Sequence, residues 1–181
     1  MKMNENNNNK INNLENKYNK LKEELNYKKD KNIINLIYEC KEERDEKIFG
    51  ENFVKNNKDN IDLIINKEKI NLIDKYRLKK GKNNIKLKIK NKITNLSYMF
   101  YECKIIKNID ELKYLNTSNC NNFEYMFYEC SSLTDIKSLE NWNVSKGNNF
   151  LGMFSGCSSL TDIKSLENWN LSNYQFNSLK F

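Results

Sequence analysis

The stretch CSSLTDIKSLENWN occurs twice in this chain, at residues 130–143 and again at residues 157–170. The two copies are identical and lie 27 positions apart. A period of this length is typical of proteins in which similar units stack, because one short unit cannot bury its own apolar side. Recent duplication of one unit is the simplest reason why outward positions repeat as well. A periodic ligand that contacts the same group in each unit is the alternative.

The repeat extends to three units of 27 residues, which together span residues 95–175. The aligned positions hold apolar side chains, Cys or Met, and they include Met99, Met126 and Met153, then Phe100, Phe127 and Phe154, then Cys103, Cys130 and Cys157, and finally Trp142 and Trp169. We expect these side chains to point inward and to form ladders through the stack. The period therefore predicts a repeat solenoid for this half of the chain.

The motif M-F-x-x-C-x-x-L carries a family resemblance. It stands as YMFYEC at 98–103, YMFYECSSL at 125–133 and GMFSGCSSL at 152–160, and NWN-x-S follows in the second and third units. These residues resemble the BspA-like leucine-rich-repeat family, in the branch found in mycoplasma-type surface proteins and protist proteins. The resemblance implies an α/β repeat fold, with a short strand and a short helical or irregular return in each unit. It also implies a binding surface, often at a cell surface, and no enzymatic activity.

Residues 32–94 predict a basic, β-rich region that caps the N-terminal end of the repeats. IKLKIKNKI at 85–93 alternates apolar and basic residues, which is typical of a half-buried strand. IINLIYEC at 33–40 predicts a strand, and IDLIINKEKINLI at 61–73 predicts a hairpin that turns at NKEK. KIFGENFV at 47–54 predicts a further short strand, with a turn at Gly50.

Residues 1–31 are polar and of low complexity, and they predict a short helix. Apolar residues follow a heptad pattern at Ile11, Leu14, Tyr18, Leu21 and Leu25. The pattern is shorter than the three to four heptads typical of a coiled coil. A solvated helix, a weak self-association helix over residues 11–25 and simple disorder all remain open. Residues 176–181 begin a further unit that is cut short, and this C-terminal end of the solenoid is a second place for self-association.

The composition bears on the compartment and on chemistry. The chain contains no His and no Pro, and it has five Cys, an odd number that argues against a complete disulfide framework. The start MKMNENNNNKINN lacks the apolar core of a secretory signal, and no apolar run reaches the length of a membrane span. We therefore expect a cytoplasmic protein with reduced cysteines. The family resemblance gives the cell surface as the alternative.

The cysteine ladder at Cys103, Cys130 and Cys157 has three interpretations. The first is a column of buried thiols that pack as small apolar side chains. A disulfide between neighbouring units and a metal site are the alternatives, although the spacing and the absence of His do not suit zinc. Cys40 and Cys120 lie outside the ladder and are expected at the surface. The sequence predicts no metal and no cofactor.

Positive charge is concentrated in the N-terminal half of the chain. Residues 75–92 are rich in Lys and Arg and contain no acidic residue, and Lys86, Lys88 and Lys90 alternate along one predicted strand face. This face is either a solvated surface that protects a sheet edge or a binder of nucleic acid or anionic lipid.

A second candidate surface lies within the repeats. Asp135, Lys137, Asp162 and Lys164 repeat at outward positions, and we expect them to lie on the exposed strand face and to contact an unknown protein partner. The Asn-x-Ser triplets at Asn95, Asn116, Asn143 and Asn170 are expected to bond to the backbone at turns.

The sequence contains no pattern typical of an active site. It has no glycine-rich phosphate loop, no nucleophile elbow and no pair of residues suited to acid–base catalysis. The sequence therefore predicts a non-catalytic protein–protein interaction module.

Overall fold

The computed structural model describes residues 14, 16, 17 and 32–169. The chain divides into two compact units, Met1–Lys31 and Asn32–Phe181. In the first unit Leu14, Asn16 and Lys17 are helical and exposed. The other heptad positions between residues 11 and 25 lie outside the described residues, as do residues 176–181, so self-association at either place stays a prediction. No helix among the described residues is long and apolar enough to cross a lipid bilayer.

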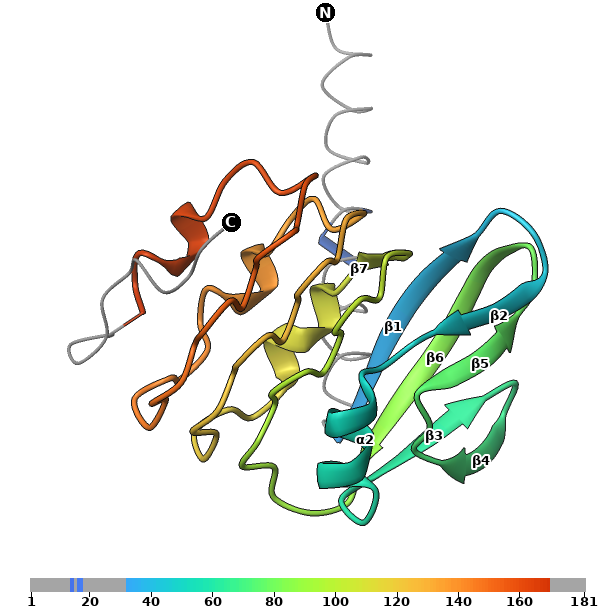
Figure 1. Cartoon of the computed structure of the whole chain (residues 1–181), viewed down its shortest axis with the longest axis horizontal. Helices are drawn as coiled ribbons and strands as arrows, with labels where there is room; N and C mark the ends of the chain where they lie inside the picture. Colours follow the sequence, from blue (N-terminus) through green and yellow to red (C-terminus); the bar gives the residue numbers. More distant parts are fainter. Residues whose placement is uncertain (1–13, 15, 18–31, 170–181) are drawn as a thin grey trace, which may run out of the picture. The chain divides into compact units, whose positions relative to one another are not determined.

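The second unit contains an antiparallel sheet of five strands in the order β4-β3-β6-β1-β7 (Figure 1). The strands are β1 (Ile33–Cys40), β3 (Ile61–Ile65), β4 (Glu68–Asn71), β6 (Gly81–Ile89) and β7 (Ile106–Asn108). A separate two-stranded sheet pairs β2 (Arg44–Lys47) with β5 (Lys75–Leu78). The helix α2 (Glu51–Asn57) follows β2.

Alternation of side chains explains the two central strands. In β1 every second residue is buried, from Ile34 to Cys40, and β6 pairs with it and buries Ile85 and Leu87 on the same face. The buried hydroxyl of Tyr38 donates a hydrogen bond to the Ile48 carbonyl at 2.6 Å. These strands were predicted from the sequence, and the structure confirms them.

The sequence predicted the β3–β4 hairpin correctly but not the segment after β2. The structure confirms the hairpin of β3 and β4, whose turn is Asn66 and Lys67. The predicted strand over residues 47–54 is wrong, because Gly50 caps the N-terminus of α2 instead. Strands β2 and β5 were not predicted.

The predicted α/β repeat solenoid of the leucine-rich-repeat type is wrong. Among the described residues the repeats contain one short strand, β7, and three short 3₁₀ helices, namely η1 (Asp110–Tyr114), η2 (Lys137–Leu139) and η3 (Lys164–Leu166). Their parallel pairing is limited to isolated bridges that link Asn95, Asn122 and Asn149. The described part of the second unit is instead a small, mostly antiparallel β-sheet domain with few helices.

Backbone conformation explains why the Met-Phe-Cys segment of each repeat forms no regular strand. Tyr98 and Glu102 have positive φ angles of 60° and 59°, so the chain cannot extend through them. The Tyr98 and Phe100 amides donate to carbonyls of the next unit, at Glu124 and Met126 respectively. Amides between them close local turns, as when Met99 donates to the Leu96 carbonyl at 3.2 Å. Along this segment, consecutive units are therefore joined by every second amide, and not by the continuous ladder of a regular strand.

One apolar core runs from the sheet into the repeats. A column of phenylalanine rings passes from Phe49 through Phe100 and Phe127 to Phe154, with centroid separations of 5.8, 5.3 and 5.4 Å. The indole N–H of Trp142 donates to the Leu112 carbonyl at 2.8 Å, one unit earlier. All the aligned Met, Phe, Cys and Trp side chains are buried.

Asparagine side chains hold the turns of the repeats. The Oδ1 of Asn95 accepts hydrogen bonds from both the amide and the hydroxyl of Ser97, at 2.8 and 2.6 Å. Asn116 holds Ser118 in the same way, and Asn143 accepts from the Ser145 amide. The structure confirms the predicted turn role for these three residues, and Asn170 lies outside the described part.

Candidate functional site

Four tyrosines form a patch on one side of the first two repeat units. This tyrosine patch consists of Tyr98, Tyr101, Tyr125 and Tyr128, and each of these residues is half-buried. The rings of Tyr101 and Tyr128 stack at 4.9 Å, and Tyr98 and Tyr125 meet at 5.5 Å. Tyr125 also meets Tyr128 edge-on at 5.4 Å. Half-exposed tyrosines in mutual contact offer flat apolar faces, and such residues are enriched at protein interfaces.

Backbone strain accompanies the patch. Tyr98 and Tyr125 have φ angles of 60° and 50°, a conformation that costs a bulky residue roughly 1–3 kcal/mol. The third unit has Gly152 at this position, where φ is 57°. A Cβ on Gly152 would approach the ring of Tyr125 closer than 3.0 Å, so the patch ends there. Aromatic side chains thus occupy a position that suits glycine better, which points to a use beyond packing.

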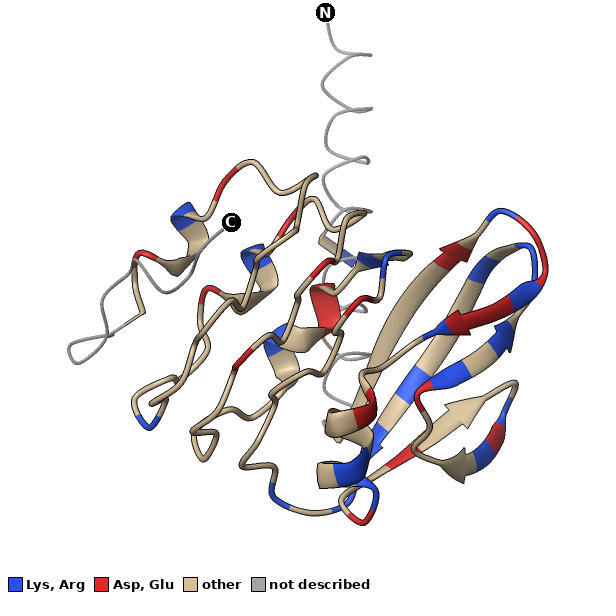
Figure 2. Ribbon diagram, viewed as in Figure 1, with Lys and Arg blue, Asp and Glu red and all other residues tan. Residues whose placement is uncertain are grey.

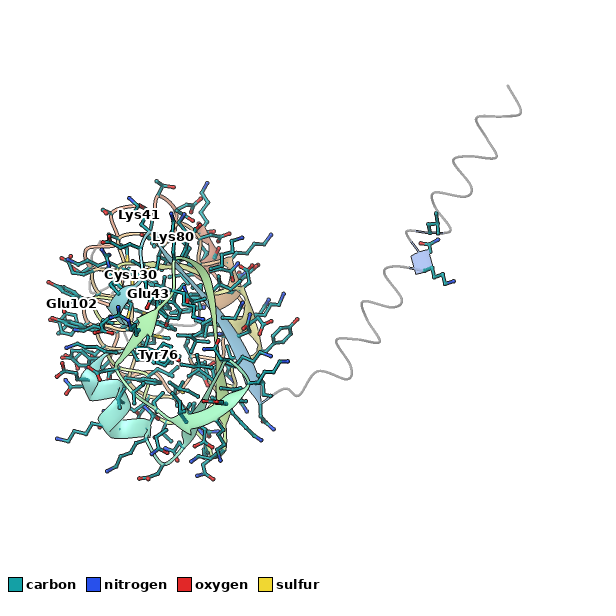
Figure 3. The ribbon with its side chains drawn as sticks, turned by 90° about the vertical axis from the view of Figure 1, so that its right-hand side faces the viewer. Lys41, Glu43, Tyr76, Lys80, Glu102 and Cys130 are labelled. Carbon is teal, nitrogen blue, oxygen red and sulfur yellow. The ribbon has the colours of Figure 1, made fainter. Side chains whose placement is uncertain are left out.

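Charged groups border the patch. The Lys47 ammonium lies 2.9 Å from a Glu102 carboxylate oxygen and 5.5 Å from the centre of the Tyr101 ring. Burial lowers the pKa of Lys47, but the hydrogen bond and the charge of Glu102 outweigh it, so the pKa is raised. Burial, with nearby Glu102, also raises the pKa of Tyr101. Figure 3 shows Glu102 at the edge of the molecule, and Cys130 lies inside.

The predicted contact residues of the repeats lie on 3₁₀ turns and not on a strand face. Asp135 accepts a hydrogen bond from the Lys137 amide at 2.7 Å, and Asp162 does the same for Lys164 at 2.6 Å. All four residues are exposed. Asp135 and Lys137 line a shallow hollow of about 290 Å³. The two aspartates therefore have a structural role as turn caps, which explains their repetition without a ligand.

The three ladder cysteines are buried free thiols. The Cys130 thiol donates to the Phe100 carbonyl at 3.1 Å, and the Cys157 thiol donates to the Phe127 carbonyl at 3.0 Å. Burial raises the pKa of Cys157 to about 12. Cys40 and Cys120 are also buried, so the expectation that they lie at the surface is wrong. Within the described residues no three side chains of the metal-binding types are grouped to hold a metal ion.

The lysines predicted on one strand face differ in their environment. Figure 2 shows positive residues along β5 and β6 and negative ones along β2. Lys90 lies beyond the end of β6 and pairs with a carboxylate oxygen of Asp62 at 2.8 Å, and Lys69 pairs with the other oxygen at 2.8 Å. Lys86 and Lys88 are exposed on β6 and have no acidic partner within the described part of the chain.

Replacing Asp62 by Asn is expected to lower stability at pH 7. Asp62 is 3% exposed, and hydrogen bonds from Lys69 and Lys90, together with their charges, lower its pKa from the ordinary aspartate value. A lowered folded-state pKa stabilises the fold above the ordinary aspartate pKa, and this contribution is lost as the pH falls through the folded value. At pH 7, urea unfolding should therefore give a lower midpoint for the variant than for the wild type. At a pH below the folded-state pKa of Asp62, the two midpoints should be equal. Equal midpoints at pH 7, or a deficit no larger than that of the exposed control Asp59→Asn, would contradict this.

Sequence reasoning missed the tyrosine patch. The tyrosines belong to the two copies of YMFYEC, and the motif by itself shows a repeat but not which of its side chains are exposed. The available signal was the loss of both tyrosines in the third copy, GMFSGC, although the inward Met, Phe and Cys stay the same. Positions that change while the core stays constant lie on the surface.

Comparison with known proteins gives one finding. The model of a family described as "Mycoplasma protein of unknown function, DUF285" matches residues 72–181. This range covers all three repeat units, β5 and β6. No curated protein and no solved structure matches the chain.

Proposed function

The chain belongs to the DUF285 family of Mycoplasma proteins of unknown function, and on this premise we propose that it is a non-catalytic protein–protein interaction module. The observation that carries the proposal is the tyrosine patch. Tyrosine supplies a large, stiff contact surface at a small entropic cost, and buried tyrosines are frequent hot spots of interfaces. The patch joins two consecutive units and so presents a continuous aromatic surface.

The border of the patch suggests the chemistry of the partner. Glu102, Glu124 and Glu129 are half-buried beside the tyrosines. A partner segment with Arg or Lys beside an apolar residue would meet both features, because cations interact with aromatic faces and with carboxylates. In the third unit Leu151, whose carbonyl accepts a hydrogen bond from the Tyr125 amide at 2.9 Å, is 48% exposed.

The test is a random peptide library displayed on phage and selected on the purified full-length chain. Selected peptides should carry Arg or Lys beside an apolar residue. The double variant Tyr101→Ala, Tyr128→Ala should weaken their binding by about 30-fold, the effect of losing one hot spot. Tyr101→Phe should bind nearly as well, because the ring face is kept.

The control is charge reversal at Asp135, Lys137, Asp162 and Lys164. These residues remain the second candidate contact surface, and the two variants distinguish it from the tyrosine patch. Peptides lost on charge reversal and retained by the tyrosine variant would contradict the patch. Circular dichroism must show that both variants stay folded.

We also propose that the repeats are related to BspA-like repeats and that the protein is located in the cytoplasm. The shared M-F-x-x-C-x-x-L motif supports a relationship of these repeats to BspA-like repeats. Five buried free thiols favour a reducing compartment such as the cytoplasm over the cell surface. Disulfides recovered from the native protein under conditions that trap thiols would contradict the compartment.

A further inference from the structure

A groove rich in positive charge lies between the two sheets, away from the tyrosine patch. It has a volume of about 650 Å³ and is lined by parts of β3, β5 and β6 and by the turns next to them. The lining includes six exposed cations, namely Lys67, Arg77, Lys79, Lys80, Lys82 and Lys86, and no acidic residue. We call this feature the basic groove. Figure 3 labels Tyr76 on β5 and Lys80 just beyond it, and both line the groove.

The turn between β5 and β6 is held in place by one side chain. Asn83 accepts a hydrogen bond from the Lys79 amide at 3.0 Å and donates to the carbonyls of Lys79 and Gly81, at 2.8 and 3.0 Å. Gly81 has φ of 91°, a conformation that favours glycine, and a Cβ there would meet nothing within 4 Å. The turn therefore requires glycine for its backbone conformation and not for lack of space. The backbone that carries three lysines is therefore fixed before any ligand binds.

The lining of the groove also includes a strained turn, between β3 and β4. Asn66 and Lys67 have φ angles of 54° and 71°, as in the tight hairpin turns where the second residue is usually glycine. Lysine is unfavourable at this position, and here it adds a cation to the groove. Strained residues that persist in a fold cluster at binding sites.

Most of these charges are not neutralised. Arg77 pairs with Glu43 at 3.0 Å, whereas the five lysines have no acidic partner within 4.0 Å among the described residues. Lys69 and Lys90 differ, because Asp62 neutralises both. Uncompensated like charges in a concave site repel one another and favour a bound anion.

We propose that the basic groove is a binding site for a small, multiply phosphorylated ligand. Its volume falls in the range of about 300–1,000 Å³ typical of small-ligand sites. Tyr76 is the only aromatic residue in the lining, so the groove is poorly suited to stacking successive bases of a nucleic acid. Ammonium groups bind phosphate as point charges, which suits several phosphates on a compact ring. The phosphates come either from a free ligand or from a phosphoinositide headgroup.

The experiment measures binding of inositol hexakisphosphate to the full-length chain by calorimetry, beside vesicles that contain phosphatidylinositol 4,5-bisphosphate. The variant Lys79→Gln, Lys80→Gln, Lys82→Gln should weaken binding of inositol hexakisphosphate by at least about 30-fold. Lys67→Gly should weaken it by about 5- to 10-fold while raising Tm by a few degrees, because it removes both a cation and the backbone strain. Greater stability with weaker binding separates a lost contact from a damaged fold.

The matched control is Lys55→Gln, Lys58→Gln, Lys104→Gln, which removes the same charge from exposed positions outside the groove. It should change binding by no more than about 2-fold. If the chain binds the vesicles and inositol hexakisphosphate displaces it, the natural ligand is a phosphoinositide headgroup. If the chain binds inositol hexakisphosphate but not the vesicles, the natural ligand is a soluble molecule. Either result supports the site. Failure of both probes to bind, an equal loss in the control, or a DNA duplex that inositol hexakisphosphate does not displace would overturn it. The tyrosine variants leave this result unchanged, so the two proposals fail independently.

Discussion

Replacing Phe127 by Ala is expected to lower the free energy of unfolding by about 4 kcal/mol, the usual cost of removing a fully buried phenyl ring. Phe127 is fully buried in the middle repeat, and its ring stacks on Phe100 on one side and Phe154 on the other. The cavity would therefore be bounded by two buried rings, of which Phe100 is itself packed against Phe49, so the site collapses poorly. Equilibrium urea unfolding measures the effect.

The matched variant is Phe127→Leu, which keeps most of the buried volume. We expect it to cost less than half as much as Phe127→Ala, because the residual cavity is smaller. A cost under about 1 kcal/mol for both variants would show that the column of rings does not stabilise the repeats.

Replacing Gly50 by Ala is expected to cost about 3 kcal/mol, at the upper end for overpacking. Gly50 precedes α2 with an ordinary φ of −76°, so backbone strain is not the cause. A Cβ there would instead lie against the carbonyl oxygen of Tyr98, well inside 3.0 Å. The Gly50 amide also donates to the Met99 carbonyl at 3.1 Å, so neither backbone can move away without losing a hydrogen bond.

The control for Gly50→Ala is Glu51→Ala at the next, exposed position of the same helix. It should change the unfolding free energy by less than about 0.5 kcal/mol. Thermal unfolding followed by circular dichroism distinguishes the two variants. Equal midpoints would show that the sheet region and the first repeat are not in close contact at this point.

The parts of the fold that sequence could predict are those in which one physical signal dominates. Strand β6 alternates apolar and charged residues, and the turn of the β3–β4 hairpin is bounded by apolar runs. Burial of the repeated Met, Phe, Cys and Trp positions follows from the period alone. In these places the local pattern and the tertiary structure agree.

The remaining parts depend on contacts that no local pattern records. Strand β2 has the sequence RDEK, with no apolar residue, and β5 has the sequence KYRL, which alternates over only four residues; the two strands are held by pairing with each other. Tyr98 adopts a left-handed backbone conformation that tyrosine normally avoids. Because the chain turns there, the predicted strand in each repeat does not form. The two turns that help to line the basic groove are separated by more than ten residues in the sequence, so they come together only in the folded chain.

The alternate hydrogen bonding between units has a consequence for how the gene can change. The Phe123 and Phe127 amides donate to Asn149 and Met153 just as the corresponding amides of the first unit donate to the second. Each unit thus presents to its successor the same donors that it received from its predecessor. Insertion or deletion of 27 residues, or of a multiple of 27, would keep each of these donors facing an acceptor, whereas other lengths would break the spacing of the aromatic column. Unequal recombination of the gene between the regions that encode the identical segments 130–143 and 157–170 adds or removes whole 27-residue units. The protein can therefore gain units while the packing between units stays the same.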